Sequence, residues 1–150
     1  MNTLFNIESA ETILRRLDNL TETNIAKWGK MDVGQMLKHC QGPLDIALGN
    51  QVLHTKLNFF QKIMLSIYKP LLFNDKPWKQ NLPTAKEFRI TTPQIFLEEK
   101  KNLKLRIETF SKKTDVKTWP NHPLFGYFTP EQWGQMQYKH LDHHLTQFNV

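Results

Sequence analysis

The chain has 150 residues, enough for one domain to bury a hydrophobic core without a disulfide or a structural metal ion. Its single cysteine, Cys40, cannot form an internal disulfide, and residues 1–12 carry no signal-peptide pattern, so we expect a cytoplasmic protein. The net charge of +6 comes from lysines scattered along the chain without a nucleic-acid-binding motif, which favours solvated surface charge over a nucleic-acid partner.

Two amphipathic helices are predicted in the first third of the chain. The first begins at Ser9. The second begins at Asp32, whose carboxylate can form a capping box with Gln35. Pro43 lacks an N–H group for the carbonyl of His39, so a kink or a break is expected just beyond that histidine. The apolar positions at helical spacing are Ile13, Leu17 and Leu20 in the first helix and Val33, Met36, Leu37, Cys40, Leu44, Ala47 and Leu48 in the second.

Residues 57–73 are apolar but contain Lys62 and Lys69, which end the run before the roughly 20 apolar residues that a membrane-spanning helix needs. We therefore expect no transmembrane segment. A helix packed on the rest of the chain, or in a contact between subunits, is the preferred interpretation. An amphipathic helix on a membrane surface is the alternative, because lysines recur every seven residues as far as Lys76.

The second half of the chain predicts a long connection and two further helices. Residues 74–92 have no clear period and are interpreted as an irregular connection that could cover a pocket. A helix is expected to begin with Thr92 as cap and Pro93 at its first position and to end near Ser111. The last helix begins at Thr129, where a cap, a proline and a capping-box glutamine coincide. Strand patterns are sparse throughout, which indicates an all-α fold.

Two histidines of the last predicted helix, His140 and His144, are four residues apart and therefore face the same way. Both lie on its inward face, whereas His143 lies at the edge of that face. His39 lies at the margin of the apolar face of the second helix, where a side chain can line a cavity. Three imidazoles can hold one metal ion and leave positions for water or substrate. Zinc, nickel, iron and copper all suit nitrogen ligands, although a single histidine is more often a hydrogen-bonded residue without a metal.

Other candidate groups are less clearly placed. Glu99 falls on the apolar face of the fourth long helix, where it could be a general base, a partner that orients a ligand histidine, or a fourth ligand. The preferred alternative is a glutamate at the edge of the apolar face that pairs with Arg106 or with solvent. We expect Asp142 to face away from the histidines. His54 and His122 lie in or beside loops, where either could contact a substrate, but solvation is the usual state of a loop histidine. The sequence contains no GxSxG, CxxC, HExxH or phosphate-binding glycine motif.

Several short motifs occur at intervals along the chain. They are Trp28-Gly29-Lys30-Met31, Gln35-Met36-Leu37-Lys38-His39-Cys40, His122-Pro123-Leu124-Phe125-Gly126, Glu131-Gln132-Trp133-Gly134 and the ending Tyr138-Lys139-His140-Leu141-Asp142-His143-His144-Leu145-Thr146-Gln147-Phe148. In combination they resemble an uncharacterised branch of the DinB/YfiT-like superfamily. The likeness spans residues 10–150 but not the stretch from about 50 to 92.

This resemblance implies a four-helix bundle, often a homodimer, here a single domain over residues 1–150 with an inserted segment between the second and third bundle helices. It also implies a divalent metal ion held by His39, His140 and His144, and Gln147 matches the HxxQ ending of the superfamily. Characterised relatives include thiol-dependent transferases and isomerases and some amide hydrolases.

From the residues and the resemblance together, we expect a metal-dependent enzyme that activates a low-molecular-weight thiol or a water for transfer or hydrolysis of a small-molecule substrate. The alternative is a non-enzymatic bundle that dimerises or rests on a membrane surface through residues 57–73 and whose histidines are only structural.

Overall fold

A computed structural model, which describes residues 2–53 and 57–150, confirms the all-α prediction. The described residues form five α-helices and two short 3₁₀ helices and contain no β-strand. None of these helices is long and apolar enough to cross a membrane. The elements in chain order are α1 (Ile7–Asn19), α2 (Val33–Ala47), α3 (Phe59–Tyr68), η1 (Lys69–Leu72), η2 (Lys86–Phe88), α4 (Phe96–Ser111) and α5 (Pro130–Gln147).

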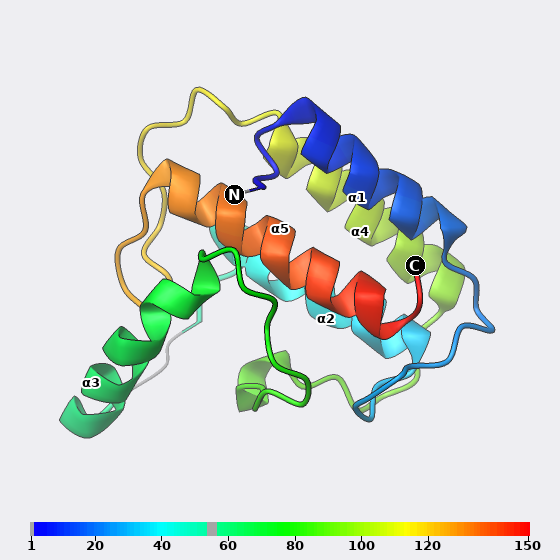
Figure 1. The fold of residues 1–150 in the computed structure, drawn as a ribbon, viewed down its shortest axis with the longest axis horizontal. Helices are drawn as coiled ribbons and strands as arrows, with labels where there is room; N and C mark the ends of the chain where they lie inside the picture. The colour runs from blue at the N-terminus through cyan, green and yellow to red at the C-terminus, as the bar shows by residue number, and fades with distance from the viewer. Residues whose placement is uncertain (1, 54–56) are drawn as a thin grey trace.

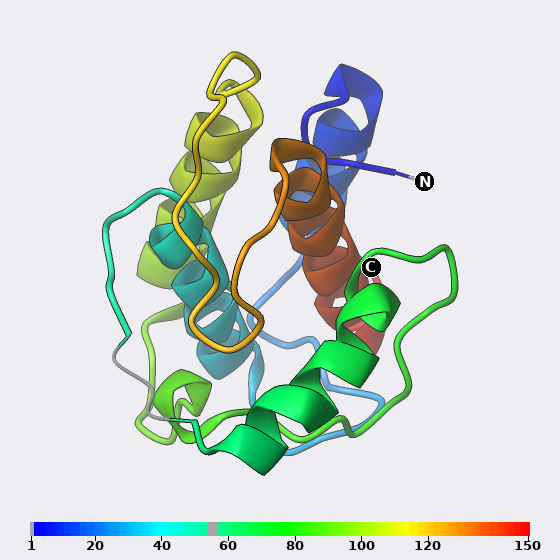
Figure 2. The ribbon, with the colours of Figure 1, turned by 90° about the vertical axis from the view of Figure 1, so that its left-hand side faces the viewer.

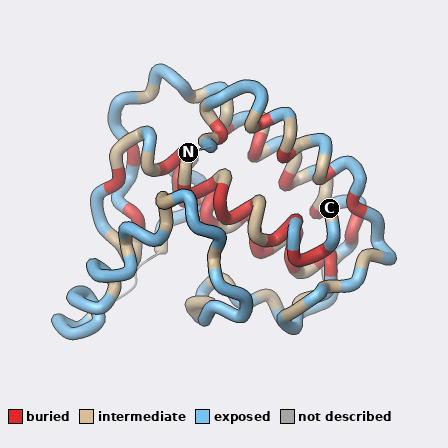
Figure 3. The backbone as a smooth tube through the Cα atoms, in the orientation of Figure 1, coloured by how far each residue is buried: buried red, intermediate tan, exposed pale blue. Residues whose placement is uncertain are grey.

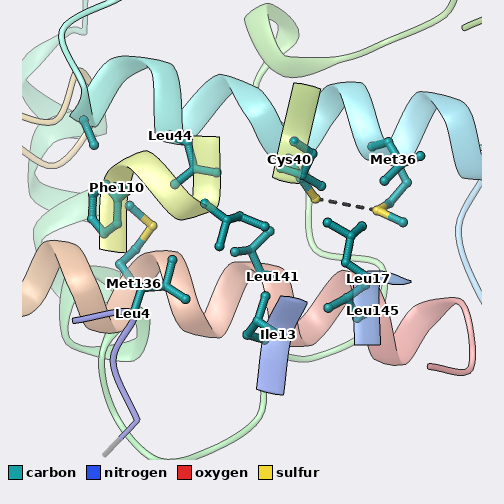
Figure 4. Close-up of a cluster of buried hydrophobic side chains, with 14 of the residues drawn as sticks. Leu4, Ile13, Leu17, Met36, Cys40, Leu44, Phe110, Met136, Leu141 and Leu145 are labelled. Atoms are coloured by element: carbon teal, nitrogen blue, oxygen red, sulfur yellow. Dashed lines mark hydrogen bonds between the residues drawn. The ribbon is translucent and has the colours of Figure 1, made fainter. Parts of the chain in front are cut away.

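Four of the helices lie side by side and enclose the hydrophobic core (Figures 1 and 2). The helices α1 and α2 each pack against both α4 and α5. Their inner faces are buried and their outer faces are exposed (Figure 3), which is the arrangement expected when apolar faces leave water. Figure 4 shows side chains from all four helices in this core, among them Ile13, Leu17, Cys40, Leu44, Phe110, Leu141 and Leu145.

Local capping signals predicted two helix starts correctly. The carboxylate of Asp32 accepts a hydrogen bond from the Gln35 N–H at 2.7 Å, and the hydroxyl of Thr129 accepts one from the Gln132 N–H at 3.1 Å. In both helices the side-chain oxygen of the glutamine accepts a hydrogen bond from the backbone N–H of the cap residue, which completes two capping boxes. These contacts fix the starts of α2 and α5, the two helices that carry the histidines.

The predicted starts of the other two core helices are wrong. Helix α1 begins at Ile7 because the side chain of Asn6 accepts the Ser9 N–H at 2.9 Å and acts as the cap. Helix α4 begins at Phe96 rather than after Thr92, whose carbonyl and hydroxyl oxygens instead accept hydrogen bonds from the Gln94 side chain. The predicted end at Ser111 is confirmed.

Of the kink or break expected in α2 just beyond His39, the break is wrong. Helix α2 runs continuously from Val33 to Ala47 with Pro43 inside it. The proline is buried, and its carbonyl oxygen accepts a hydrogen bond from the Gln137 side chain of α5 at 2.8 Å. Tertiary packing therefore holds the helix across the position where its own hydrogen-bond ladder lacks a donor.

The segment between α2 and α4 contains the only described α-helix that does not belong to the core. No residue of α3 is buried, so the expectation that this helix packs on the rest of its own chain is wrong. Its C-terminal neighbour η1 provides the contact with α5 instead. The following stretch, residues 73–95, is irregular apart from η2, as predicted.

Candidate metal centre

The structure brings together three of the histidines singled out in the sequence. His39 lies on α2, and His140 and His144 lie one turn apart on α5. The ring centroids are 5.1 Å apart for His39 and His140 and 4.8 Å apart for each of the other two pairs. One nitrogen of each ring lies within 4.8 Å of the other two, and all three side chains are buried. We call this set the histidine cluster.

The backbone of the last residue of η2 sets the orientation of His39. Its Nδ1 lies 2.8 Å from the carbonyl oxygen of Phe88. A carbonyl oxygen can only accept, so the hydrogen-bond partner assigns the proton of the neutral ring to Nδ1. Nε2 is then the nitrogen with a free lone pair, and it lies 3.1 Å from Nε2 of His140. No sequence pattern marks a backbone carbonyl, so this partner was not predicted.

A relay of hydrogen bonds orients His144. The carbonyl oxygen of Trp28 accepts a hydrogen bond from Nε2 of Gln147 at 2.6 Å, which fixes the direction of the amide. Oε1 of Gln147 therefore faces His144 and accepts a hydrogen bond from its Nδ1 at 2.8 Å. Nε2 of His144 is left with its lone pair, as in His39. Such partners on the second ring nitrogen are characteristic of histidines that bind metal ions.

Gly29 explains why the loop before α2 can approach this relay so closely. The residue has a φ of +86°, and a Cβ atom added to it would lie 2.7 Å from Nε2 of Gln147. Both the backbone conformation and the space therefore favour glycine. The motif Trp28-Gly29 thus contributes to the histidine cluster through its backbone, a role that its sequence alone did not reveal.

His140 completes the cluster but lacks a partner on its other nitrogen. Its Nδ1 is buried without a hydrogen bond in the described part of the chain. With the proton on Nδ1, the lone pairs of His140 and His39 point at each other across 3.1 Å. With the proton on Nε2, Nδ1 becomes a buried acceptor without a donor. A cation between the rings suits the first arrangement, because tetrahedral metal–nitrogen bonds of about 2.0–2.1 Å place ligand nitrogens roughly 3.3 Å apart.

Burial keeps the three rings neutral. Desolvation lowers the pKa of His39, although its hydrogen bond to Phe88 acts in the opposite direction. Desolvation also lowers the pKa of His144 to about 3, helped by the nearby His39. The pKa of His140 lies well below its usual value for the same reason. At neutral pH all three imidazoles are therefore unprotonated, the state in which they can bind a metal ion.

Trp78 covers the cluster from the segment after η1. Its ring centroid lies 5.8 Å from those of both His140 and His143. Its Nε1 donates to the carbonyl oxygen of Leu71 at 3.1 Å. The ammonium of Lys139, on α5, donates to the same carbonyl oxygen and to the backbone and side-chain oxygens of Asn74 at 2.6–2.8 Å. Lys139 therefore fastens this segment onto α5.

A cavity of about 170 Å³ opens beside His39. It lies between α2 and the segment around Phe88, and its lining includes Lys38, Gln41, Phe88 and Ile90. Oε1 of Gln41 is buried without a hydrogen-bond partner among the described residues. The cavity is smaller than the usual pockets for drug-sized ligands, which begin at about 300 Å³. Its size therefore matches a small molecule.

The other candidate residues lie outside the cluster. Glu99 is buried, but its carboxylate accepts a hydrogen bond from Gln41 at 2.6 Å and pairs with Lys38 at 3.4 Å. The preferred ion pair of Glu99 with Arg106 is wrong, because Arg106 pairs with Asp45 at 2.8 Å. Among the described residues, the side chains placed to hold a metal ion are three histidines, and Glu99 is not one of them.

His143 and Asp142 occupy the flank of α5. His143 is partly buried, and its ring lies 5.5 Å from that of Trp28 and 5.1 Å from that of His144. This position agrees with its expected place at the edge of the inward face. The carboxylate of Asp142 forms an ion pair with Arg16 of α1. Asp142 therefore ties two helices together and takes no part in the cluster.

His122 is buried, so the expectation that it is solvated is wrong, whereas His54 lies outside the described residues. It is 8% exposed, and its ring stacks on Phe128 at a centroid distance of 5.2 Å. Its Nδ1 accepts hydrogen bonds from the N–H groups of Leu124 at 3.1 Å and Phe125 at 3.3 Å. Desolvation, with a smaller contribution from the charge of Lys69, lowers its pKa to about 4. His122 therefore stabilises the loop before α5 as a neutral ring.

The sequence was also compared with known proteins. The model of a family described as "Protein of unknown function (DUF1569)" matches residues 2–150. Neither the curated proteins nor the solved structures include a match to the chain. The comparisons therefore cover nearly the whole chain with one family and attach no activity to it.

Proposed function

We propose that this chain, which belongs to the DUF1569 family of proteins of unknown function, is a metal-dependent enzyme with a mononuclear site at the histidine cluster. The observation that carries the proposal is the convergence of three buried, neutral imidazoles. The ligands would be His39, His140 and His144, and the resemblance of the sequence motifs to the DinB/YfiT-like superfamily supports the same set. A bound divalent ion would lower the pKa of a coordinated water or thiol toward neutrality.

The number of protein ligands and the burial of the site limit the groups that it can bind. Three protein ligands leave at least one coordination position for an exogenous group. Trp78 and the buried setting of the rings restrict access, so we propose a small-molecule substrate. The superfamily resemblance favours a low-molecular-weight thiol or a water as the activated group. Hydrogen bonds that His39 and His144 donate to Phe88 and Gln147 hold two of the rings in place, so these ligands need little reorganisation on binding.

Elemental analysis of protein purified without a histidine tag tests the site. We expect about one divalent metal ion per chain in the wild-type protein and little metal in His39→Ala, His140→Ala and His144→Ala. His143→Ala is the matched control, because this histidine lies on the same helix at the edge of the cluster, and it should retain the metal. A wild-type protein without stoichiometric metal, or a His140→Ala variant with unchanged metal, would contradict the proposal.

Cobalt substitution then distinguishes the two kinds of activated group. A thiol such as 2-mercaptoethanol that enters the open position of the Co²⁺ protein should produce a sulfur-to-metal charge-transfer band in the near ultraviolet. If the band is absent at saturating thiol while the visible spectrum still reports bound Co²⁺, the hydrolytic alternative is favoured.

Replacement of Gln147 by leucine should weaken metal binding by roughly 10- to 100-fold, the usual cost of removing a partner that orients a ligand histidine. Leucine cannot accept the hydrogen bond from His144, so the ring loses its fixed orientation. Gln135→Leu is the matched control on the same helix, since Gln135 bonds only to Glu131 in the described residues. Competition titration with a chromophoric chelator measures both affinities. Equal affinities of Gln147→Leu and the wild type would refute this role for Gln147.

A further inference from the structure

Helix α3 carries an apolar face that points into solvent. Six of its side chains are between 44% and 79% exposed. At about 100° per residue they occupy one continuous half of the helix circumference. Figure 3 shows the helix exposed along nearly its whole length, in contrast to the core helices. The six side chains, which we call the α3 apolar face, are Phe59, Phe60, Ile63, Met64, Ile67 and Tyr68.

The charged side chains of the sequence segment that contains this face have one sign. The sequence contains no aspartate or glutamate between Asp45 and Asp75, whereas it contains three lysines in that interval. One of them, Lys62, is exposed on α3 beside the apolar face. Another, Lys69, is directed inward, where its ammonium donates to the carbonyl oxygen of Tyr127 and lies 5.0 Å from the centre of the Phe128 ring. The face is therefore suited to an anionic surface.

A second copy of the chain fits this face less well. Helix α3 has ten residues, so it is about 15 Å long. Its apolar face therefore offers an area on the order of a few hundred Å², against about 800 Å² on each partner in a standard stable interface. Pairing two such faces would also bring the Lys62 side chains together without an acidic residue of the same segment to neutralise them.

The position of α3 leaves it open to a large flat partner. Its N-terminal end projects away from the four core helices at one corner of the molecule (Figures 1 and 2). Its C-terminal end continues into η1, where Lys139 of α5 holds the carbonyl oxygen of Leu71 at 2.7 Å. A projecting, tethered amphipathic helix can lie flat on a bilayer without disturbing the core.

We infer that α3 docks the protein onto an anionic membrane surface, with the α3 apolar face between the lipid headgroups and Lys62 beside the lipid phosphates. The apolar side chains supply area that leaves water, and the lysine supplies attraction to negative charge. This docking does not depend on the histidine cluster, so it can be tested separately from metal binding.

Co-sedimentation with vesicles tests the inference. The wild-type protein should bind vesicles of 70% phosphatidylcholine and 30% phosphatidylserine more strongly than vesicles of phosphatidylcholine alone. The double variant Phe59→Ser/Phe60→Ser should lose at least about tenfold in partition, because two exposed aromatic anchors are removed. The matched control is Leu97→Ser/Leu105→Ser, which removes two leucines of α4 that are 75% and 59% exposed, and it should bind like the wild type.

A charge variant tests the electrostatic part. Lys62→Glu should reduce binding to the anionic vesicles by roughly fivefold or more, in line with about 1 kcal/mol for each lysine near a membrane surface, and should leave weak binding to neutral vesicles unchanged. Lys69 is unsuitable for this purpose because its ammonium contacts Tyr127 and Phe128. Circular dichroism and urea unfolding confirm that each variant is folded.

Three results would overturn the inference. The first is the absence of wild-type binding to anionic vesicles, and the second is equal binding by Phe59→Ser/Phe60→Ser. The third is a wild-type protein that is dimeric in light scattering and does not bind vesicles, together with a double variant that is monomeric. That result would assign the α3 apolar face to a second copy of the chain.

Discussion

Addition of Zn²⁺ at a thousand times its dissociation constant should raise the free energy of unfolding by about 4 kcal/mol. The reason is that only the folded chain presents three imidazoles at one point, since His39 and His140 are 101 positions apart in sequence. For a domain of this size the corresponding rise in melting temperature is roughly 8 to 16 °C. Differential scanning calorimetry of metal-free protein with and without added Zn²⁺ measures the effect.

Variants separate specific binding from a general effect of the ion. Each is compared with its own metal-free form, because removal of a buried ring also lowers stability directly. His140→Ala should show little stabilisation, whereas His143→Ala should show nearly the full rise. Repeating the experiment with Ni²⁺ and Fe²⁺ ranks the ions. If none of the three ions stabilises the wild-type protein, the histidine cluster is a structural feature and the proposed metal centre is wrong.

Acidification from pH 6.5 to pH 4 should cost about 3 kcal/mol of folding free energy at His122 alone. The pKa of this buried ring is lowered to about 4 in the folded protein, whereas in the unfolded chain it is close to its usual value of about 6.5. As the pH falls through this window, the unfolded chain takes up a proton that the folded protein does not. The contribution of His122 to the free energy of unfolding therefore decreases as the pH is lowered from 6.5 to 4, and it is highest above pH 6.5.

His122→Asn isolates this contribution. The asparagine side chain can still accept the N–H group of Leu124, but it does not titrate in this range. The variant should be less stable than the wild type at pH 7, because it loses the stacking on Phe128. Its stability should then fall less steeply on acidification. Urea unfolding of both proteins between pH 7 and pH 4.5, with a chelator present, measures the difference. Parallel losses in the two proteins would contradict the role assigned to His122.

Features of the fold that depend on neighbouring residues could be predicted from the sequence. The capping boxes at Asp32 and Thr129 involve residues three apart, so their chemistry is visible in a short stretch. The start of α1 was missed because Asn6 and Ser9 are both good caps, and the sequence does not show which one accepts and which one donates. The exposure of α3 was missed because an apolar helix face does not reveal which surface covers it.

In the candidate site, too, the features that depend on neighbouring residues could be predicted from the sequence. The spacing of His140 and His144 on one helix is a local property, and the position of His39 on the margin of α2 follows from its own helical period. Gln147, which accepts the hydrogen bond of His144 from three residues along the same helix, is local as well. The carbonyl groups of Phe88, which meets His39, and of Trp28, which meets Gln147, come into place only through the path of the folded backbone, and neither side chain is the hydrogen-bonding group.

The distribution of the histidine cluster along the chain determines when it can form during synthesis. At roughly 5 to 20 residues per second, on the order of 5 to 20 s separate the synthesis of His39 from that of His140. In that interval Gln147 has not been synthesised, and His39 lacks the other two histidines of the cluster. Any ion that the cluster takes is therefore selected by the finished fold from the ions present at that time, and not by the nascent chain on the ribosome.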